Sequence, residues 1–143
     1  MGLLTVDVRA TPAGAVVALA GALDYSTAPQ VREAVERLAL GPGRQLVVDM
    51  GGLDFIDSSG LSTLLAAHHR AEEAHAHTVL AAVPERFDRV FRVTGLDQVF
   101  TAAPSADAAV EAWTADRGTA GDGRAAERGT AGDGWAADRG HGG

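Results

Sequence analysis

The chain has 143 residues, of which 46% are hydrophobic, so it has the length of one ordinary domain and enough apolar side chains to bury a core. Its formal net charge of -7 excludes a broad basic surface for nucleic acid or an anionic membrane, which leaves a protein or a small molecule as the expected partner. It contains no cysteine, which excludes disulfides, thiolate catalysis and metal sites with Cys ligands.

We expect no targeting signal in the N-terminal segment. No basic stretch precedes its apolar residues, and the apolar run over residues 13–23 is shorter than the roughly 20 residues that a membrane-spanning helix needs. We therefore expect neither export nor membrane insertion. A cytoplasmic location is the expectation, and it also fits a chain without cysteine.

Short apolar runs predict the strands. Residues 4–9 alternate between apolar and polar side chains, which is typical of a half-buried strand. Residues 15–19 and 46–50 are continuous apolar runs, which are typical of buried strands. A fourth strand is predicted over residues 79–83, and a weaker fifth lies around residues 99–101.

The first predicted helix follows the second strand. Over residues 31–38, apolar side chains recur at i, i+3, i+4 and i+7, which indicates an amphipathic helix. Thr27 and Gln30 have the spacing of a capping box, so the Thr27 side chain is expected to cap this helix. The sequence Gly41-Pro42-Gly43 is expected to end it.

A second helix is predicted after Ser58. Its leucines, Leu61, Leu64 and Leu65, lie on one helical face, and we expect all three to face the sheet. Should Leu64 be buried, its replacement by alanine is expected to cost about 2 to 5 kcal/mol of stability.

The order of the elements predicts the fold class. Two further helices are expected around residues 87–91 and 109–113. Two opening strands that are close enough for a hairpin, followed by alternating helices and strands, indicate an α/β fold. We expect a mixed sheet of four to five strands, with about four helices packed chiefly on one side of it.

The composition changes after Trp113, where Gly, Ala, Asp and Arg dominate. A seven-residue sequence that begins at Arg117 recurs eleven residues later, at Arg128, and large apolar side chains are absent apart from Trp135. Such a segment cannot build a core of its own. We therefore predict one domain over residues 1–115 and a disordered, dispensable repeat tail over residues 116–143.

Two segments stand out as candidate functional loops. Residues 21–29 and residues 54–61 each follow a buried strand and lead into a helix. Helix N-termini present unpaired amide groups and the positive end of the helix dipole, so a phosphate on Ser58 or Ser59 would be tolerated there. Gly60 lacks a side chain and would allow the backbone of another protein to approach. From the residues alone, the same sequence is also an ordinary helix N-cap.

These two segments resemble a known family. Asp-Ser-Ser-Gly-Leu over residues 57–61 follows a Val-Val-Asp strand, and Gly-x-Leu-Asp-x-x-Thr-Ala-Pro lies over residues 21–29. Together they resemble the STAS domain, and in particular the bacterial anti-sigma factor antagonists of the SpoIIAA and RsbV type. The resemblance covers about residues 3–113 and implies the STAS fold.

The resemblance also implies a function. In the unphosphorylated state such a protein binds an anti-sigma factor that is also a serine kinase, and thereby frees a sigma factor. Phosphorylation switches it off, and the phosphorylated residue carries over to Ser58. A serine phosphatase is a further expected partner. The chain itself would need no cofactor or metal and would catalyse no reaction. The residues that the resemblance assigns to the partner-binding surface are Asp24, Tyr25, Ser26, Thr27, Asp57, Ser58, Ser59 and Gly60.

One residue departs from the family pattern. Ala22 stands where the family often has Glu, which removes any polar contact that this side chain would make. The same loops would also suit a second function, that of a STAS accessory subunit of a lipid or solute ABC transporter, in which they would form a constitutive docking surface.

Serine hydrolase activity and metal binding are less expected than the two binding functions. A serine hydrolase would need glycine where Ile56 stands, together with a histidine base that the sequence does not place. A metal site is suggested only by four histidines, which are more typical of a solvated helix end and turn. These histidines are His68, His69, His75 and His77.

Overall fold

A computed structural model describes residues 3–118 of the chain, with side chains described as far as residue 115. The described residues form five strands, four α-helices and two short 3₁₀ helices. In chain order these are β1 (Leu4–Ala10), β2 (Gly14–Leu23), α1 (Ala28–Glu36), β3 (Gln45–Ile56), α2 (Ser58–Glu73), β4 (His77–Ala81), η1 (Glu85–Phe87), α3 (Asp88–Val93), η2 (Leu96–Gln98), β5 (Thr101–Ala103) and α4 (Ala106–Gly118).

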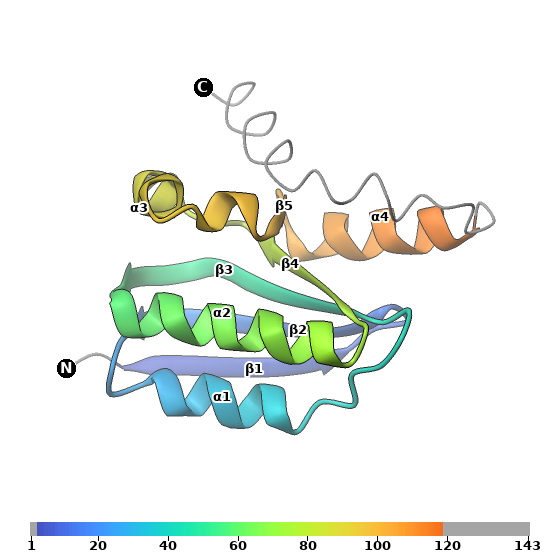
Figure 1. Cartoon of the computed structure of the whole chain (residues 1–143), viewed down its shortest axis with the longest axis horizontal. Coiled ribbons are helices and arrows are strands. Elements are labelled where there is room, and N and C mark those ends of the chain that lie inside the picture. Colours follow the sequence, from blue (N-terminus) through green and yellow to red (C-terminus); the bar gives the residue numbers. More distant parts are fainter. Residues whose placement is uncertain (1–2, 119–143) are drawn as a thin grey trace.

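The strands form one mixed sheet in the order β1-β2-β3-β4-β5. β1 pairs with β2 in antiparallel orientation, and the three other pairs are parallel. The predicted mixed sheet with an opening hairpin is therefore confirmed. Because β2, β3 and β4 are parallel, their carboxyl ends meet at one edge of the sheet, and α1 and α2 both begin there (Figure 1).

The two faces of the sheet carry two separate cores. Leu46 and Val48 of β3 belong to the larger core, which α1, α2 and α3 cover. Val47 points to the opposite face and belongs to a smaller core with Ala106 and Ala109 of α4. Three helices thus pack on one side and one helix on the other, as predicted.

β2 and β3 are longer than the sequence predicted. Residues 21–23 and 54–56, which we expected in loops, are the last residues of these two strands. The pairing of β2 with β3 shifts between Ala18 and Ala20 and again between Gly21 and Ala22. Each shift is a bulge that lets the strands continue past residues that break simple alternation.

The end of the first helix was also predicted wrongly. α1 ends at Glu36, before the Gly41-Pro42-Gly43 sequence that was expected to end it. The amide of Leu38 donates to the carbonyl oxygen of Val35 over 3.0 Å, which is the tighter i to i-3 pattern that closes a helix. Leu38 therefore packs against the core from the turn that follows the helix.

The buried face of α2 is made mostly of small residues. Leu64 is only 1% exposed, whereas Leu61 and Leu65 are half-buried at the margin of the core. The prediction that all three leucines face the sheet is therefore correct for Leu64 and only partly correct for the other two. The remaining buried residues of α2 are Gly60, Thr63, Ala67 and Ala71.

The last described helix, α4, passes residue 115, and the predicted division into a domain and a repeat tail stays a prediction. α4 continues to Gly118, whereas the domain was expected to end at residue 115. Residues 119–143, which hold most of the predicted repeat tail, lie outside the described residues. Within residues 3–118, no helix is both long enough and apolar enough to span a bilayer.

Leu64→Ala is expected to reduce the free energy of unfolding by about 2 to 5 kcal/mol, because it leaves a cavity beneath α2. Chemical denaturation measures the change, and Leu3→Ala, at an exposed leucine, is the control that should cost almost nothing. An unchanged stability of Leu64→Ala, together with lost partner binding, would mean that this side chain belongs to an interface.

Truncation after Gly118 is expected to leave a cooperative thermal transition within a few degrees of that of the full chain. The removed segment is rich in Gly and charged residues and cannot repay the entropy of ordering it. Calorimetry of both chains checks this, and a lost or strongly lowered transition would show that the repeats belong to the domain.

Candidate functional site

The two candidate loops lie side by side at the carboxyl edge of the sheet. Leu23, the last residue of β2, pairs with Ile56, the last residue of β3. The amide of Asp57 donates to the carbonyl oxygen of Leu23 over 3.3 Å. The sheet therefore places Asp24 and Asp57, each the first residue after its strand, at the starts of two neighbouring loops.

The Asp24 carboxylate organises the first loop. Its Oδ1 accepts hydrogen bonds from the Ser26 amide at 2.9 Å, from the Ser26 hydroxyl at 2.8 Å and from the Thr27 amide at 3.1 Å. Such bonds from a side chain to the residues that follow it are typical of an Asx turn. Asp24 thus shapes the loop from within, and this turn holds Tyr25 at the tip of the loop, where it is 80% exposed.

The predicted Thr27 capping box is wrong. Thr27 is the N-cap residue of α1, but its side chain makes no bond to the first turn of the helix. Instead, its buried hydroxyl donates to the carbonyl oxygen of Ala22 over 2.8 Å and accepts from the amide of Asp24 over 2.9 Å. The Thr27 hydroxyl thus bonds to backbone groups at the end of β2, and pairing such groups avoids the cost of leaving a buried polar group unsatisfied.

Asp57 caps the second helix. Its Oδ1 accepts from the amide of Gly60 over 2.9 Å, and its carbonyl oxygen accepts from the amide of Leu61 over 3.0 Å. Asp57 therefore makes a standard side-chain N-cap, as the residues alone suggested. Ser58 and Ser59 occupy the first two positions of α2, and their amides have no hydrogen-bond partner among the described residues.

The two serines differ in access. Ser58 is exposed, whereas Ser59 is half-buried. The Ser59 carbonyl oxygen also accepts a bond from the Thr63 hydroxyl at 2.9 Å, within the helix. A modifying enzyme or a partner would therefore reach the Ser58 hydroxyl first, next to two amides that can donate to an anion.

Gly60 is buried, and the space beside it belongs to this chain. A Cβ atom at Gly60 would lie 2.6 Å from the carbonyl oxygen of Leu23 and 2.7 Å from Cγ1 of Ile56. The first turn of α2 thus rests directly on the ends of β2 and β3. Glycine is needed here for this internal contact, whereas the sequence suggested that it admits the backbone of another protein.

The predicted partner-binding residues therefore separate into two groups. Tyr25, Ser26 and Ser58 are exposed, and Asp24, Asp57 and Ser59 are partly exposed. Thr27 and Gly60 are buried and support the loops from below. Contact of any of these residues with a partner stays a prediction.

Phe55 lies beside the site and was missed by the sequence analysis. It pairs with Ala22 in the sheet and is 50% exposed, which is unusual for a large aromatic side chain in a strand. The sequence held a signal for it, because Phe55 and Ile56 are consecutive. On an alternating strand only one of two neighbouring residues can face the core.

The four histidines do not form a metal site. Within residues 3–118, no group of three or more His, Cys, Asp or Glu side chains is placed to hold a metal ion. His77 stacks on Trp113 with ring centroids 5.3 Å apart, and His68 packs edge-on against Phe100 at 5.2 Å. Burial is the main cause that lowers the pKa of His68 below its ordinary value, although the carboxylate of Glu72 opposes the shift.

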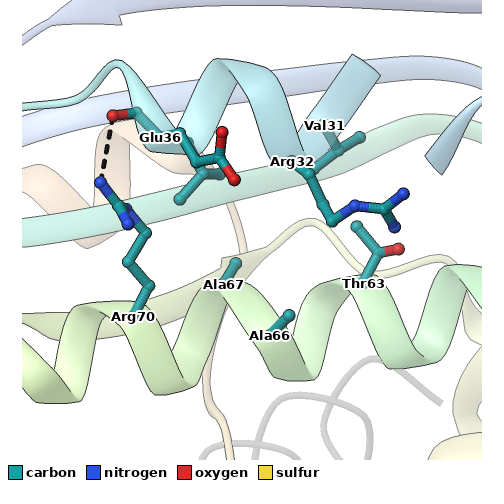
Figure 2. A pocket seen from close by; sticks show the side chains of 8 residues that line it. Val31, Arg32, Glu36, Thr63, Ala66, Ala67 and Arg70 are labelled. Atoms are coloured by element: carbon teal, nitrogen blue, oxygen red, sulfur yellow. Dashed lines mark hydrogen bonds between the residues drawn. The ribbon is translucent and has the colours of Figure 1, made fainter. Parts of the chain in front are cut away.

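A groove of about 190 Å³ runs between α1 and α2, away from the loops. Figure 2 shows Arg32 and Arg70 toward its opposite ends and Ala66 and Ala67 of α2 between them. The Arg70 guanidinium donates from Nη2 to the carbonyl oxygen of Glu36 over 3.1 Å, which ties the end of α1 to α2. The groove therefore marks the seam where α1 meets the small residues Ala66 and Ala67 of α2.

Comparisons with known proteins agree with this architecture. A family model described as "Mlab, STAS domain" matches residues 6–102. The chain is 32% identical to the anti-sigma-B factor antagonist of Listeria monocytogenes over 81 residues, which are 57% of this chain and 71% of that protein. It is 26% identical to the anti-sigma-B factor antagonist of Bacillus subtilis over 108 residues, which are 76% of this chain and 98% of that protein.

A solved structure has the same fold. The crystal structure of an anti-sigma factor antagonist from Mycobacterium paratuberculosis matches with a TM-score of 0.66 and 27% identity. The match covers 78% of this chain and 95% of that chain. The described strands and helices are thus an arrangement seen in an experimental structure.

Gly60→Ala is expected to destabilise the protein by roughly 1 to 3 kcal/mol, because the new methyl group meets backbone that cannot move freely. Gly41→Ala is the matched control, since a Cβ atom there would find no atom within 4 Å. Thermal or chemical denaturation of both variants measures the difference. Equal stability of the two variants would mean that α2 does not rest on the Leu23 carbonyl group.

Proposed function

The chain belongs to the STAS domain family, whose model matches residues 6–102, and we propose that it is an anti-sigma factor antagonist. In the unphosphorylated state it binds an anti-sigma factor that is also a serine kinase, and this frees a sigma factor. The names of two curated relatives support the antagonist function. The protein works in the cytoplasm, where sigma factors act, and catalyses no reaction itself.

The exposure of Ser58 at the start of α2 is the observation that carries this proposal. The Asp57 carboxylate is engaged with the Gly60 amide, so the cap is satisfied without the Ser58 hydroxyl. Ser58 is therefore free to be modified without loss of a bond that holds the helix. In the proposal, the anti-sigma factor kinase phosphorylates Ser58, and a serine phosphatase reverses the modification.

Electrostatics explain why a phosphate on Ser58 would weaken partner binding and leave the fold unchanged. A phosphoserine adds about -1.5 to -2 charges, and the free amides and dipole at a helix N-terminus accommodate them favourably. The surrounding surface already holds Asp24, Asp54 and Asp57. A partner that binds the unmodified surface would meet extra bulk, altered charge and a strongly hydrated group that is costly to bury.

The alternative function is that of a transporter subunit. The geometry of the two loops fits either function. A constitutive docking surface needs no modified serine, whereas the antagonist switch does. The names of the curated relatives favour the antagonist. Phosphorylation therefore separates the two functions.

Incubation with the anti-sigma factor kinase of the same genome and ATP is expected to place one phosphate on the chain, at Ser58. Mass spectrometry of the intact protein and of its peptides locates the phosphate. Ser58→Ala should remain unmodified, whereas Ser59→Ala, the neighbouring control, should still be phosphorylated. Phosphate on Ser59 would refute the residue assignment, and a chain that no such kinase modifies would favour the docking subunit.

Ser58→Asp is expected to fold normally and to bind the kinase at least about tenfold more weakly than the wild-type chain, because it places a fixed negative charge where the phosphate would be. Ser58→Ala should bind as the unphosphorylated protein does. Calorimetric titration measures both affinities, and thermal melting checks both folds. Binding of Ser58→Asp as tight as that of the wild type would contradict the switch.

A further inference from the structure

Among the described residues, 3–118, no helix covers one half of one face of the sheet. On the side of α4, the side chains of Val16 and Val47 pack with Ala106 and Ala109. Farther along the same strands this cover ends, since Ala18 is only half-buried and Ala20 is exposed. The bare half lies toward the carboxyl edge of the sheet, where the candidate loops begin (Figure 1).

The two bulges place Phe55 on this bare half. Leu53 and Ile56 pair with Gly21 and Leu23 and remain on the side of the larger core. Phe55 pairs with Ala22, which puts its side chain on the side of α4. The bulges therefore keep the core side apolar and, at the same time, present an aromatic ring on the opposite face.

The residues around this ring are small and uncharged. We name this surface the Phe55 patch, and it consists of Ala18, Ala20, Ala22, Gly51, Gly52 and Phe55. A Cβ atom at Gly52 would lie 2.8 Å from Cβ of Ala20, so backbone and methyl groups pack tightly beneath the patch. None of the other patch residues has a side chain long enough to cover Phe55, which is half-exposed.

The rim of the patch is acidic. Asp7 of β1 and Asp49 of β3 pair with Ala18 from its two sides, so both carboxylates lie on the same face as the patch. Asp54, the bulge residue next to Phe55, has an exposed side chain, and its distance of 4.0 Å to Arg86 makes only a loose ion pair. A partner for this surface would therefore carry an apolar socket with basic side chains around it.

We propose that Phe55 is an anchor that inserts into an apolar socket on the anti-sigma factor, and that the interface extends from the Ser58 loop across the Phe55 patch. This inference rests on the proposed function and adds a second contact region to it. The occupant is the anti-sigma factor because the patch adjoins the loops: Ala22 and Phe55 stand two residues before Asp24 and Asp57, with which the two loops begin. Aromatic side chains, Phe included, are enriched in protein interfaces, where they bury a large apolar area.

Ala22 keeps this contact apolar. Its methyl group lies beside Phe55 and adds no charge, so the partner meets an apolar pair at this point. A carboxylate at position 22 would stand next to the ring and would have to lose water when the socket closes over it. The pair of Ala22 and Phe55 therefore favours partners whose socket is apolar at its centre.

Calorimetric titration with each purified anti-sigma factor kinase of the same genome tests the anchor. Phe55→Ala is expected to weaken binding at least about tenfold, and Phe55→Leu to stay within about threefold of the wild type. Ala22→Glu is expected to weaken binding about tenfold while Ser58 is unchanged. Val8→Ala is the matched control, because Val8 is 44% exposed but pairs with Val17, whose side chain belongs to the larger core on the opposite face.

The outcomes separate the inference from the function on which it rests. Thermal melting of every variant should match the wild type, since Phe55 is half outside the core. If the wild type and Phe55→Ala bind with affinities within twofold, the anchor is refuted and the antagonist function stands. An equal loss in Val8→Ala also refutes it. If the wild type binds none of the kinases, the proposed function fails and the anchor fails with it.

Discussion

The first turn of α2 rests on the carbonyl oxygen of Leu23, and this contact fixes the geometry of the whole site. It requires a residue without a side chain at Gly60, because any Cβ atom there would lie 2.6 Å from that oxygen. The same oxygen accepts from the Asp57 amide, so the end of β2, the end of β3 and the start of α2 are joined at one point. Ser58 is exposed because its neighbours Asp57 and Gly60 are held in this way.

Some residues of the site hold the loops in place, and others are exposed on its surface. Asp24, Thr27 and Asp57 bond to backbone groups, and Gly60 lets α2 pack closely on the strand ends, so together they hold the loops in one shape. Tyr25, Ser58 and Phe55 remain at the surface. A surface that is held in one shape loses little entropy when it is bound. A phosphate on such a surface acts through its charge, its bulk and the cost of removing its water. The proposed switch uses this property, since a phosphate can alter binding without altering the fold.

Much of the fold could be predicted because apolar periodicity reports burial directly. The runs over residues 15–19 and 46–50 lie in β2 and β3, and the stripe over residues 31–38 marks α1. The residues at which these strands and helices end could not be predicted from the same periodicity. Two bulges carry β2 and β3 past glycines that looked like loop residues, and bulges depend on pairing with another strand, which a local pattern does not contain.

The site was predictable in its location and less so in its details. Asp57 caps its helix because its partners are local, so the pattern of residues sufficed. Thr27 has the same local pattern, but its hydroxyl bonds to backbone groups at the end of β2, which only the fold brings within reach. Phe55 lies on the face of the sheet that α4 covers only in part. Its exposure therefore depends on contacts between distant parts of the chain.

The most direct test compares one preparation of the protein before and after stoichiometric phosphorylation. Calorimetric titration of both forms with the anti-sigma factor kinase gives the two dissociation constants, and thermal melting of both forms gives the two stabilities. The account predicts that the phosphate on Ser58 weakens binding at least about tenfold, while the melting temperature changes by no more than a few degrees. Equal affinities of the two forms, or a phosphorylated form that has lost its cooperative transition, would contradict it.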